Sequence, residues 1–125
     1  MNLIKPAGLK AGDTIGLIAL SGIIEDKLKV ERAVEYFNSL GYKVVLSENI
    51  YDTNRYLAGS DEIKISELHR FFKDDSIKAV ICVRGGYGAI RLINKIDYNI
   101  IKTHPKIFCG FSDVTALSLM MLKRA

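Results

Sequence analysis

The fold is decided by a stretch near the start of the chain, Thr14-Ile15-Gly16-Leu17-Ile18-Ala19-Leu20. This run is apolar and follows the turn Ala11-Gly12-Asp13, a pattern typical of a strand that is buried on both faces. The next segment, Asp26 to Leu40, carries apolar residues at steps of three and four, which predicts an amphipathic helix. Gly41 is expected to end that helix, because glycine readily takes the left-handed conformation found there. The start of the chain therefore predicts one strand–helix unit.

The same alternation recurs along the rest of the chain. Further strands are predicted at 42–46, 78–83 and 106–109, and further helices at 61–73, about 89–96 and 112–123, with a short helical or irregular piece from Asp97 to Pro105. Four such units with short connections imply a parallel sheet joined by right-handed crossovers. The predicted fold is α/β: a parallel sheet of at least four strands flanked by helices on both faces, in a Rossmann-like three-layer arrangement.

Composition limits the classes of protein that the chain can represent. It has 125 residues, of which 49% are hydrophobic and 26% are charged, a balance that fits one globular domain and excludes a disordered chain. No apolar run approaches the ~18 residues of a membrane span, and the first residues lack the pattern of a signal peptide. The excess of 18 basic over 14 acidic residues is small and scattered along the chain. We therefore expect neither a membrane nor a nucleic acid as partner.

The two cysteines indicate the compartment rather than the chemistry. Cys82 and Cys109 each lie inside an apolar run, which favours buried thiols in a reducing environment. They are far apart and neither has a histidine beside it, so their spacing does not fit a zinc site. The cysteines therefore give no support to a zinc site.

Any functional site is expected at one edge of the sheet, because ligands bind outside the carboxyl ends of parallel strands. Four loops are predicted to lie at that edge. They are Ser21-Gly22, the 47–60 loop, Arg84-Gly85-Gly86-Tyr87-Gly88 and Gly110-Phe111-Ser112-Asp113.

Ser112 has two interpretations. A serine on a tight turn between a strand and a helix can be a nucleophile, and the helix amides behind it can stabilise an oxyanion. The pattern is partial, because Val114 stands where a small residue is usual. Alternatively, Ser112 caps the helix and Asp113 interacts with the helix dipole. The chain offers this serine no obvious base, since His104 precedes the last strand and His69 lies beside the apolar stripe of the second helix.

The glycine-rich loop, residues 84–88, is open to similar alternatives. Its backbone N–H groups could bind a phosphate or donate to an oxyanion, or its glycines could simply form a turn. The patterns of dinucleotide-binding and nucleotide-phosphate loops are absent. Arg84 could hold a substrate carboxylate or pair with a neighbouring acid.

Together these residues resemble a known family, the LD-carboxypeptidases, which includes muramoyltetrapeptide carboxypeptidases and microcin-immunity serine peptidases. The resemblance follows the whole chain in order and spacing, although Ala11 and Leu20 stand where the family usually has proline. It rests on four stretches: residues 9–22, Tyr56-Leu57-Ala58-Gly59-Ser60-Asp61, residues 84–88, and Gly110-Phe111-Ser112-Asp113-Val114-Thr115-Ala116-Leu117.

The resemblance implies roles for individual residues. Ser112 would be the nucleophile, and the backbone N–H groups of Asp113 and Gly86 would form the oxyanion hole. The candidate substrate-binding residues, all in the same loops, are Arg84, Gly85, Tyr87 and Ser21. The family completes its triad with a Glu and a His from a second domain. Residues 1–125 would then be the N-terminal, nucleophile-bearing domain of a two-domain enzyme, with the C-terminal domain absent from this chain.

The resemblance also implies a reaction: release of the terminal D-amino acid, D-alanine, from the LD-peptide bond of muropeptide tetrapeptides during cytoplasmic peptidoglycan recycling. Neither a metal nor a cofactor is implied, and a homodimer is left open. Without its second domain the chain is expected to be inactive. Two alternatives remain open at this point: an immunity peptidase that acts on a peptide–nucleotide antibiotic, and a non-catalytic α/β binding domain in which Ser112 is only a cap.

Overall fold

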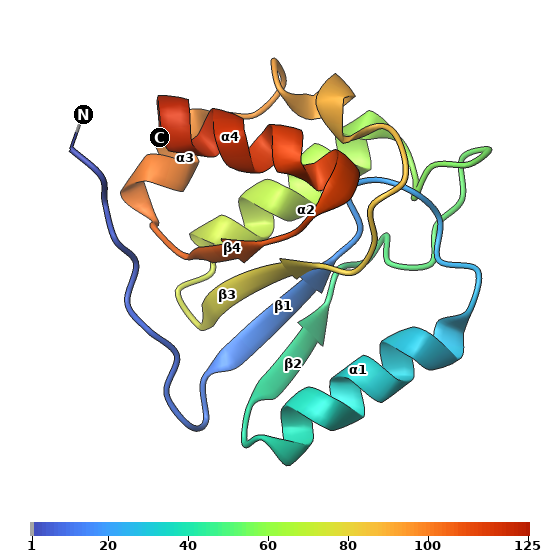
Figure 1. Cartoon of the computed structure of the whole chain (residues 1–125), viewed down its shortest axis with the longest axis horizontal. Helices are drawn as coiled ribbons and strands as arrows, with labels where there is room; N and C mark the ends of the chain where they lie inside the picture. Colours follow the sequence, from blue (N-terminus) through green and yellow to red (C-terminus); the bar gives the residue numbers. More distant parts are fainter. Residues whose placement is uncertain (1) are drawn as a thin grey trace.

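The computed structural model describes residues 2–125 and contains one four-stranded parallel sheet (Figure 1). The strands are ordered β2-β1-β3-β4, as expected when consecutive βα units cross over the sheet. In chain order the elements are β1 (Thr14–Ile18), α1 (Lys27–Ser39), β2 (Lys43–Leu46), α2 (Asp61–Lys73), β3 (Ile77–Cys82), the 3-10 turn η1 (Ala89–Leu92), α3 (Tyr98–Thr103), β4 (Ile107–Cys109), the 3-10 turn η2 (Ser112–Val114) and α4 (Thr115–Arg124).

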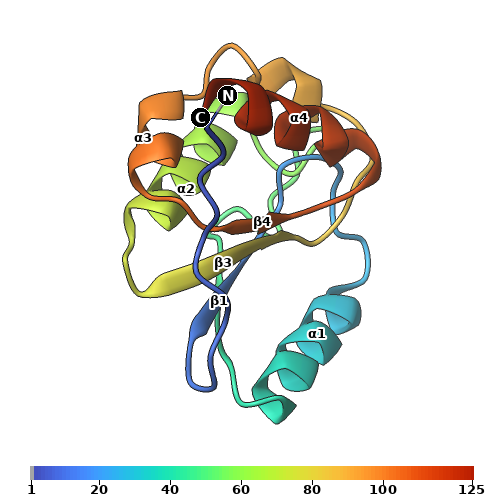
Figure 2. The same cartoon turned by 60° about the vertical axis from the view of Figure 1, so that its left-hand side comes forward.

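The helices lie on both faces of the sheet. Figures 1 and 2 show α1 alone on one face and α2, α3 and α4 together on the other. The predicted α/β fold with three layers is therefore confirmed. Within residues 2–125, no helix combines the length and the apolar character that a membrane crossing requires.

The central strand β1 packs against both helical layers. Ile15 and Leu17 point toward α1 and join a buried cluster with Val30, whereas Ile18 belongs to the opposite cluster, with Phe71 of α2. Gly16 points to the same side as Ile18, and a β-carbon on it would lie 2.6 Å from the Phe71 ring. Glycine at this position therefore lets α2 approach the sheet closely.

This contact predicts a stability defect in Gly16→Ala. The Phe71 side chain is fully buried, so an added methyl group must displace a ring that has nowhere to go. We expect the free energy of unfolding to fall by about 1–3 kcal/mol, the usual cost of overpacking a core. Urea unfolding measures the change. Gly8→Ala is the control, because nothing lies within 4 Å of a β-carbon there; equal stabilities of the two variants would contradict the packing argument.

Two local predictions are wrong. The helix expected at about 89–96 is only the 3-10 turn Ala89–Leu92, whereas the short helical piece expected from Asp97 is present as α3, which begins at Tyr98. The break occurs at Asp97, whose side chain accepts a hydrogen bond from the Asn99 N–H and so caps a new helix. Cys109, expected to be buried, is exposed. It lies in the edge strand β4, and α1 does not extend over that part of the sheet (Figure 1).

The other cysteine, Cys82, is buried as predicted. Cys82 ends β3 inside the core, and burial raises the pKa of its thiol well above the ordinary value. A buried, protonated thiol is a poor nucleophile. Cys82 therefore belongs to the core rather than to a site.

Candidate functional site

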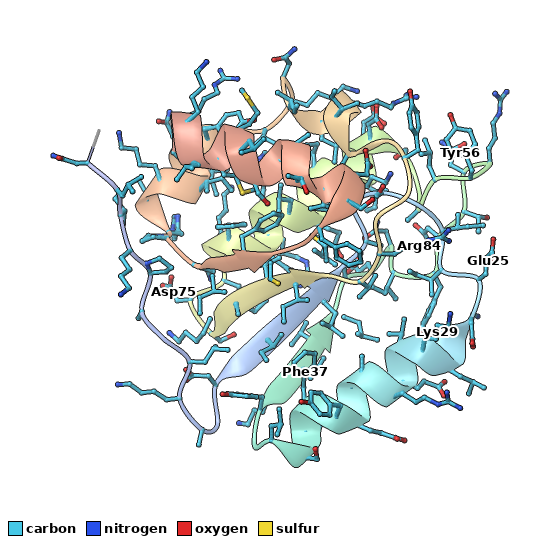
Figure 3. All side chains as sticks on the ribbon, in the orientation of Figure 1. Glu25, Lys29, Phe37, Tyr56, Asp75 and Arg84 are labelled. Atoms are coloured by element: carbon cyan, nitrogen blue, oxygen red, sulfur yellow. The ribbon has the colours of Figure 1, made fainter. Side chains whose placement is uncertain are left out.

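Three of the four predicted loops converge on one point at the carboxyl edge of the sheet. The Gly22 N–H, after β1, donates to the Gly85 carbonyl, after β3, at 3.0 Å. A β-carbon on Gly85 would lie 3.3 Å from the hydroxyl oxygen of Ser112, after β4. The 47–60 loop joins them from the side, because the Ile23 N–H donates to the Tyr56 carbonyl at 3.1 Å. Figure 3 shows Tyr56 and Arg84 at the end toward which the strand arrows point, with Asp75 at the other end.

Ser112 has a strained backbone and an exposed side chain. Its φ is +58°, in the left-handed region that costs a residue with a β-carbon roughly 1–2 kcal/mol. Neither the turn η2 nor helix α4 has a side chain that caps it. The capping interpretation therefore does not account for Ser112. Strain of this kind at an exposed polar residue is typical of functional sites.

The partial match at Val114 has a structural explanation. A β-carbon on Gly110 would lie 2.6 Å from the Val114 side chain, which is fully buried. Because Gly110 has no side chain, the Val114 side chain can occupy the space beside it. The small residue before the serine thus accommodates the larger residue after it.

The strain predicts that Ser112→Gly stabilises the protein. Glycine adopts a positive φ without the steric cost, so we expect about 1 kcal/mol more unfolding free energy than for Ser112→Ala. Arg55→Gly is the matched control, because among residues 2–125 Arg55 is the other non-glycine residue at positive φ, +56°, and it lies in an exposed turn. Urea unfolding should show a similar gain there. A Ser112→Gly variant no more stable than Ser112→Ala would argue against strain at this position.

The Asp113 carboxylate holds two other loops in place. It accepts hydrogen bonds from the Ser21 hydroxyl, after β1, and from the Ala89 N–H at 2.9 Å, after β3. Sequence reasoning missed this role, because Asp113 was considered only for its backbone N–H and for the helix dipole. Ser21, a predicted substrate-binding residue, is fully buried, and its hydroxyl is directed to Asp113. The structure thus places Ser21 behind the site surface.

The glycine loop is shaped by close contacts that only glycine permits. A β-carbon on Gly85 would lie 3.0 Å from the Ser112 β-carbon, and one on Gly86 would lie 3.1 Å from the Gly22 α-carbon. Gly86 also has a φ of +115°. These contacts go beyond those of an ordinary glycine turn, because they bring the loop against both the serine turn and the first loop.

Two larger side chains of this loop point outward. Arg84 is exposed and donates a hydrogen bond to the Ile23 carbonyl; among residues 2–125 it pairs with no acid. Tyr87 is 57% exposed and packs edge-to-face on Tyr56, with 5.8 Å between ring centroids. Tyr56 is thus a site-edge residue that the sequence analysis did not single out. Both tyrosines and Arg84 are available to a ligand.

The histidines of the chain are engaged elsewhere. The Asp97 N–H donates to Nε2 of His69 at 3.0 Å, and burial lowers the pKa of this imidazole. His104 follows α3, at the amino end of β4, where its ring contacts Thr103 and Ile100. The structure of residues 2–125 therefore brings together a serine, backbone N–H donors and an arginine, but no base beside the serine. The same residues hold no group of three or more side chains suited to bind a metal.

Comparison with known proteins assigns this arrangement to a family. Residues 15–125 match the model of the "LD-carboxypeptidase N-terminal domain". The chain is 42% identical over 113 residues to the "Probable murein peptide carboxypeptidase" of Bacillus subtilis. The aligned residues cover 90% of this chain and 35% of that protein. It is 31% identical over 113 residues to the microcin C7 self-immunity protein MccF of Escherichia coli, covering 89% of this chain and 33% of MccF.

Solved structures show the same fold. MccF in complex with aspartyl sulfamoyl adenosine gives a TM-score of 0.88 at 30% identity, over 92% of this chain and 35% of that one. Another MccF structure, with a TM-score of 0.87 at 29% identity over the same shares, is of an active-site variant in which a serine, an asparagine and a lysine are replaced by alanine. A muramoyltetrapeptide carboxypeptidase from Oxalobacter formigenes gives 0.79 at 28% identity, over 90% of this chain and 37% of that one. The chain thus spans about a third of the length of these relatives.

Proposed function

Since the chain belongs to the LD-carboxypeptidase family, as the match over residues 15–125 shows, we propose that it is the nucleophile-bearing domain of a serine-type LD-carboxypeptidase. The observation that carries the proposal is the placement of Ser112. Its hydroxyl is exposed on a strained turn, beside a glycine loop whose backbone leaves it room. The serine among the active-site substitutions of MccF supports the same role.

The reaction would proceed by acyl transfer. The Ser112 oxygen attacks the carbonyl carbon of the peptide bond, and its proton passes to a base, which returns a proton to the departing amine of the D-amino acid. Water then cleaves the acyl-enzyme and regenerates the serine. The base and its partner would be a His and a Glu supplied by a second domain, as the family resemblance implies.

The oxyanion hole would be formed by the backbone N–H groups of Asp113 and Gly86. The first belongs to the residue after the nucleophile, the usual position for one donor. The second belongs to the Gly85–Gly86 peptide, whose carbonyl is held by the Gly22 N–H at 3.0 Å. Two donors fixed before substrate binds stabilise the developing negative charge without reorganising.

Arg84 and Tyr87 would contact the substrate. A carboxypeptidase must recognise a free carboxylate, and the Arg84 guanidinium is an exposed cation beside the first loop. Tyr87, three residues further along the same loop, adds an exposed aromatic face. Ser21 would act indirectly by holding Asp113. The substrate class would be muropeptide tetrapeptides ending in D-alanine, turned over in cytoplasmic peptidoglycan recycling.

A second candidate function is supported by the MccF structures. One of them holds aspartyl sulfamoyl adenosine, and another holds glutamyl sulfamoyl guanosine. An immunity peptidase acting on an aminoacyl nucleotide would use the same serine and the same oxyanion donors. A substrate panel separates the two functions, because only the first requires a terminal D-amino acid.

The test compares the chain alone with a chimera in which residues 1–125 replace the matching third of the Bacillus subtilis relative. We expect the chain alone to be inactive, since members of a catalytic triad act as a unit. The chimera should release D-alanine from a muropeptide tetrapeptide, but not L-alanine from the matched L-terminal peptide. Cleavage of aspartyl sulfamoyl adenosine alone would favour the second function. A folded chimera that cleaves neither class would count against both.

A further inference from the structure

A buried lysine lies beneath the site. Lys64 belongs to α2, its side chain is fully buried, and its ammonium donates to the Ser21 carbonyl at 3.0 Å. Within residues 2–125 this is its sole hydrogen bond. Burying an ammonium group is costly unless hydrogen bonds and opposite charges compensate for the water that it loses.

The electrostatic surroundings of Lys64 contain two carboxylates. Burial lowers the pKa of the Lys64 ammonium, and the charges of Asp61 and Asp113 oppose that effect. Asp61 is already bound by Arg91 at 3.1 Å and by Lys95 at 2.9 Å. The one hydrogen bond of the Lys64 ammonium therefore goes to the Ser21 carbonyl, which also accepts from the Ala58 N–H at 3.0 Å.

The contact continues through two peptide groups. The Ser21 carbonyl and the Gly22 N–H belong to one peptide group, and that N–H donates to the Gly85 carbonyl at 3.0 Å. The Gly85 carbonyl and the Gly86 N–H belong to the next. In a trans peptide the carbonyl and the N–H point in opposite directions. The hydrogen bonds thus run in one direction, from the Lys64 ammonium to the Gly86 N–H.

A branch leads to the other side of the site. The Ser21 hydroxyl donates to the Asp113 carboxylate, which also accepts from the Ala89 N–H at 2.9 Å. Fixing Ser21 therefore also fixes the residue whose backbone N–H would be the other oxyanion donor.

We propose that Lys64 is a positioning residue that orients and polarises the oxyanion hole through the Ser21–Gly22 and Gly85–Gly86 peptide groups. The proposal rests on the proposed function for its catalytic consequence, but the relay itself is a property of this chain. Hydrogen bonds in a chain strengthen one another, and a charge at one end increases the effect. With the ammonium removed, the Gly86 N–H would be a weaker and less well-directed donor.

The first test is made on the 15N-labelled chain by NMR, so it needs no enzymatic activity. In Lys64→Met we expect the Gly22 amide proton to move upfield and to exchange with solvent about tenfold faster or more, because the Ser21–Gly22 peptide group loses the charge-assisted hydrogen bond to its carbonyl. Lys64→Arg, which keeps the charge, should restore most of the protection. Unchanged shift and exchange of Gly22 in a folded Lys64→Met would overturn the relay.

Lys106→Met is the matched control. Lys106 is partly buried, and its ammonium, like that of Lys64, donates to backbone carbonyls; these are the carbonyls of Asp74 and Ile77, at the amino edge of the sheet. This variant should lose stability. The chemical shift of the Gly22 amide proton should not change, and its exchange rate should change no more than the rates of the β1 amides. Equal effects of both variants on Gly22 would mean that Lys64 only stabilises the fold, contrary to the proposal.

The second test uses the chimera. Lys64→Met should lower kcat about tenfold or more with KM nearly unchanged, because an oxyanion donor acts in the transition state. Full kcat in this variant would overturn the catalytic consequence. A wild-type chimera that folds but is inactive would instead count against the proposed function, and the NMR result would then decide the relay alone.

Discussion

The Ser112→Ala variant of the chimera is expected to lose turnover by roughly 10⁴- to 10⁶-fold, the loss seen when a serine nucleophile is removed from a triad. The hydroxyl oxygen is the atom that forms the new bond, so no neighbouring group can replace it. The fold should not change, because the Ser112 side chain is exposed and caps no helix. Initial rates with a muropeptide tetrapeptide and far-ultraviolet circular dichroism measure the two effects.

A serine outside the site provides the control for this variant. Ser66 is exposed on α2, and Ser66→Ala should keep full turnover. A serine-directed phosphonate should label Ser112 in the active chimera and leave Ser112→Ala unlabelled. Near-normal turnover of Ser112→Ala would exclude the nucleophile role and leave the strain at φ +58° without a catalytic explanation.

The strands and long helices were predictable from the sequence, because their apolar patterns are set by burial in a layered fold. The run at 14–20 contains β1, and the predicted helix 61–73 coincides with α2, whose Ser60 cap accepts from the Ile63 N–H at 3.2 Å. The region at 89–96 was not predictable, because its periodicity is compatible with a helix. The Asp97 cap and the 3-10 geometry after Gly88 decide its conformation.

The site was predictable as a set of loops but not as a network. Parallel strands bring their carboxyl ends to one edge, so the glycine loop and the serine turn had to be neighbours. The contact between Ser21 and Asp113 spans 92 residues, and that between Lys64 and Ser21 spans 43. The periodicity of α2 places Lys64 on a helix but cannot show that its ammonium reaches a loop across the core. Such contacts depend on side-chain geometry that only the structure shows.

The Gly86→Val variant of the chimera is expected to lose about a hundred- to a thousandfold in turnover, the usual cost of losing one oxyanion donor. A β-carbon at this position would lie 3.1 Å from the Gly22 α-carbon and 3.2 Å from its nitrogen. The added side chain must therefore push the loop away from the first loop. This movement turns the Gly86 N–H and breaks the hydrogen bond between Gly22 and Gly85. KM should change less than kcat, because the donor acts on the transition state.

Backbone strain must be separated from this effect, because Gly86 has a φ of +115° and valine there would cost roughly 1–3 kcal/mol of stability. Gly41→Val is the matched control. Gly41 has a φ of +91° and nothing within 4 Å of a β-carbon, so valine there is strained without touching the site. We expect both variants to unfold at lower urea concentration and only Gly86→Val to lose turnover. Equal turnover in two folded variants would mean that the glycine serves the turn alone, and the second donor would then have to come from Gly85 or the Ser21–Gly22 loop.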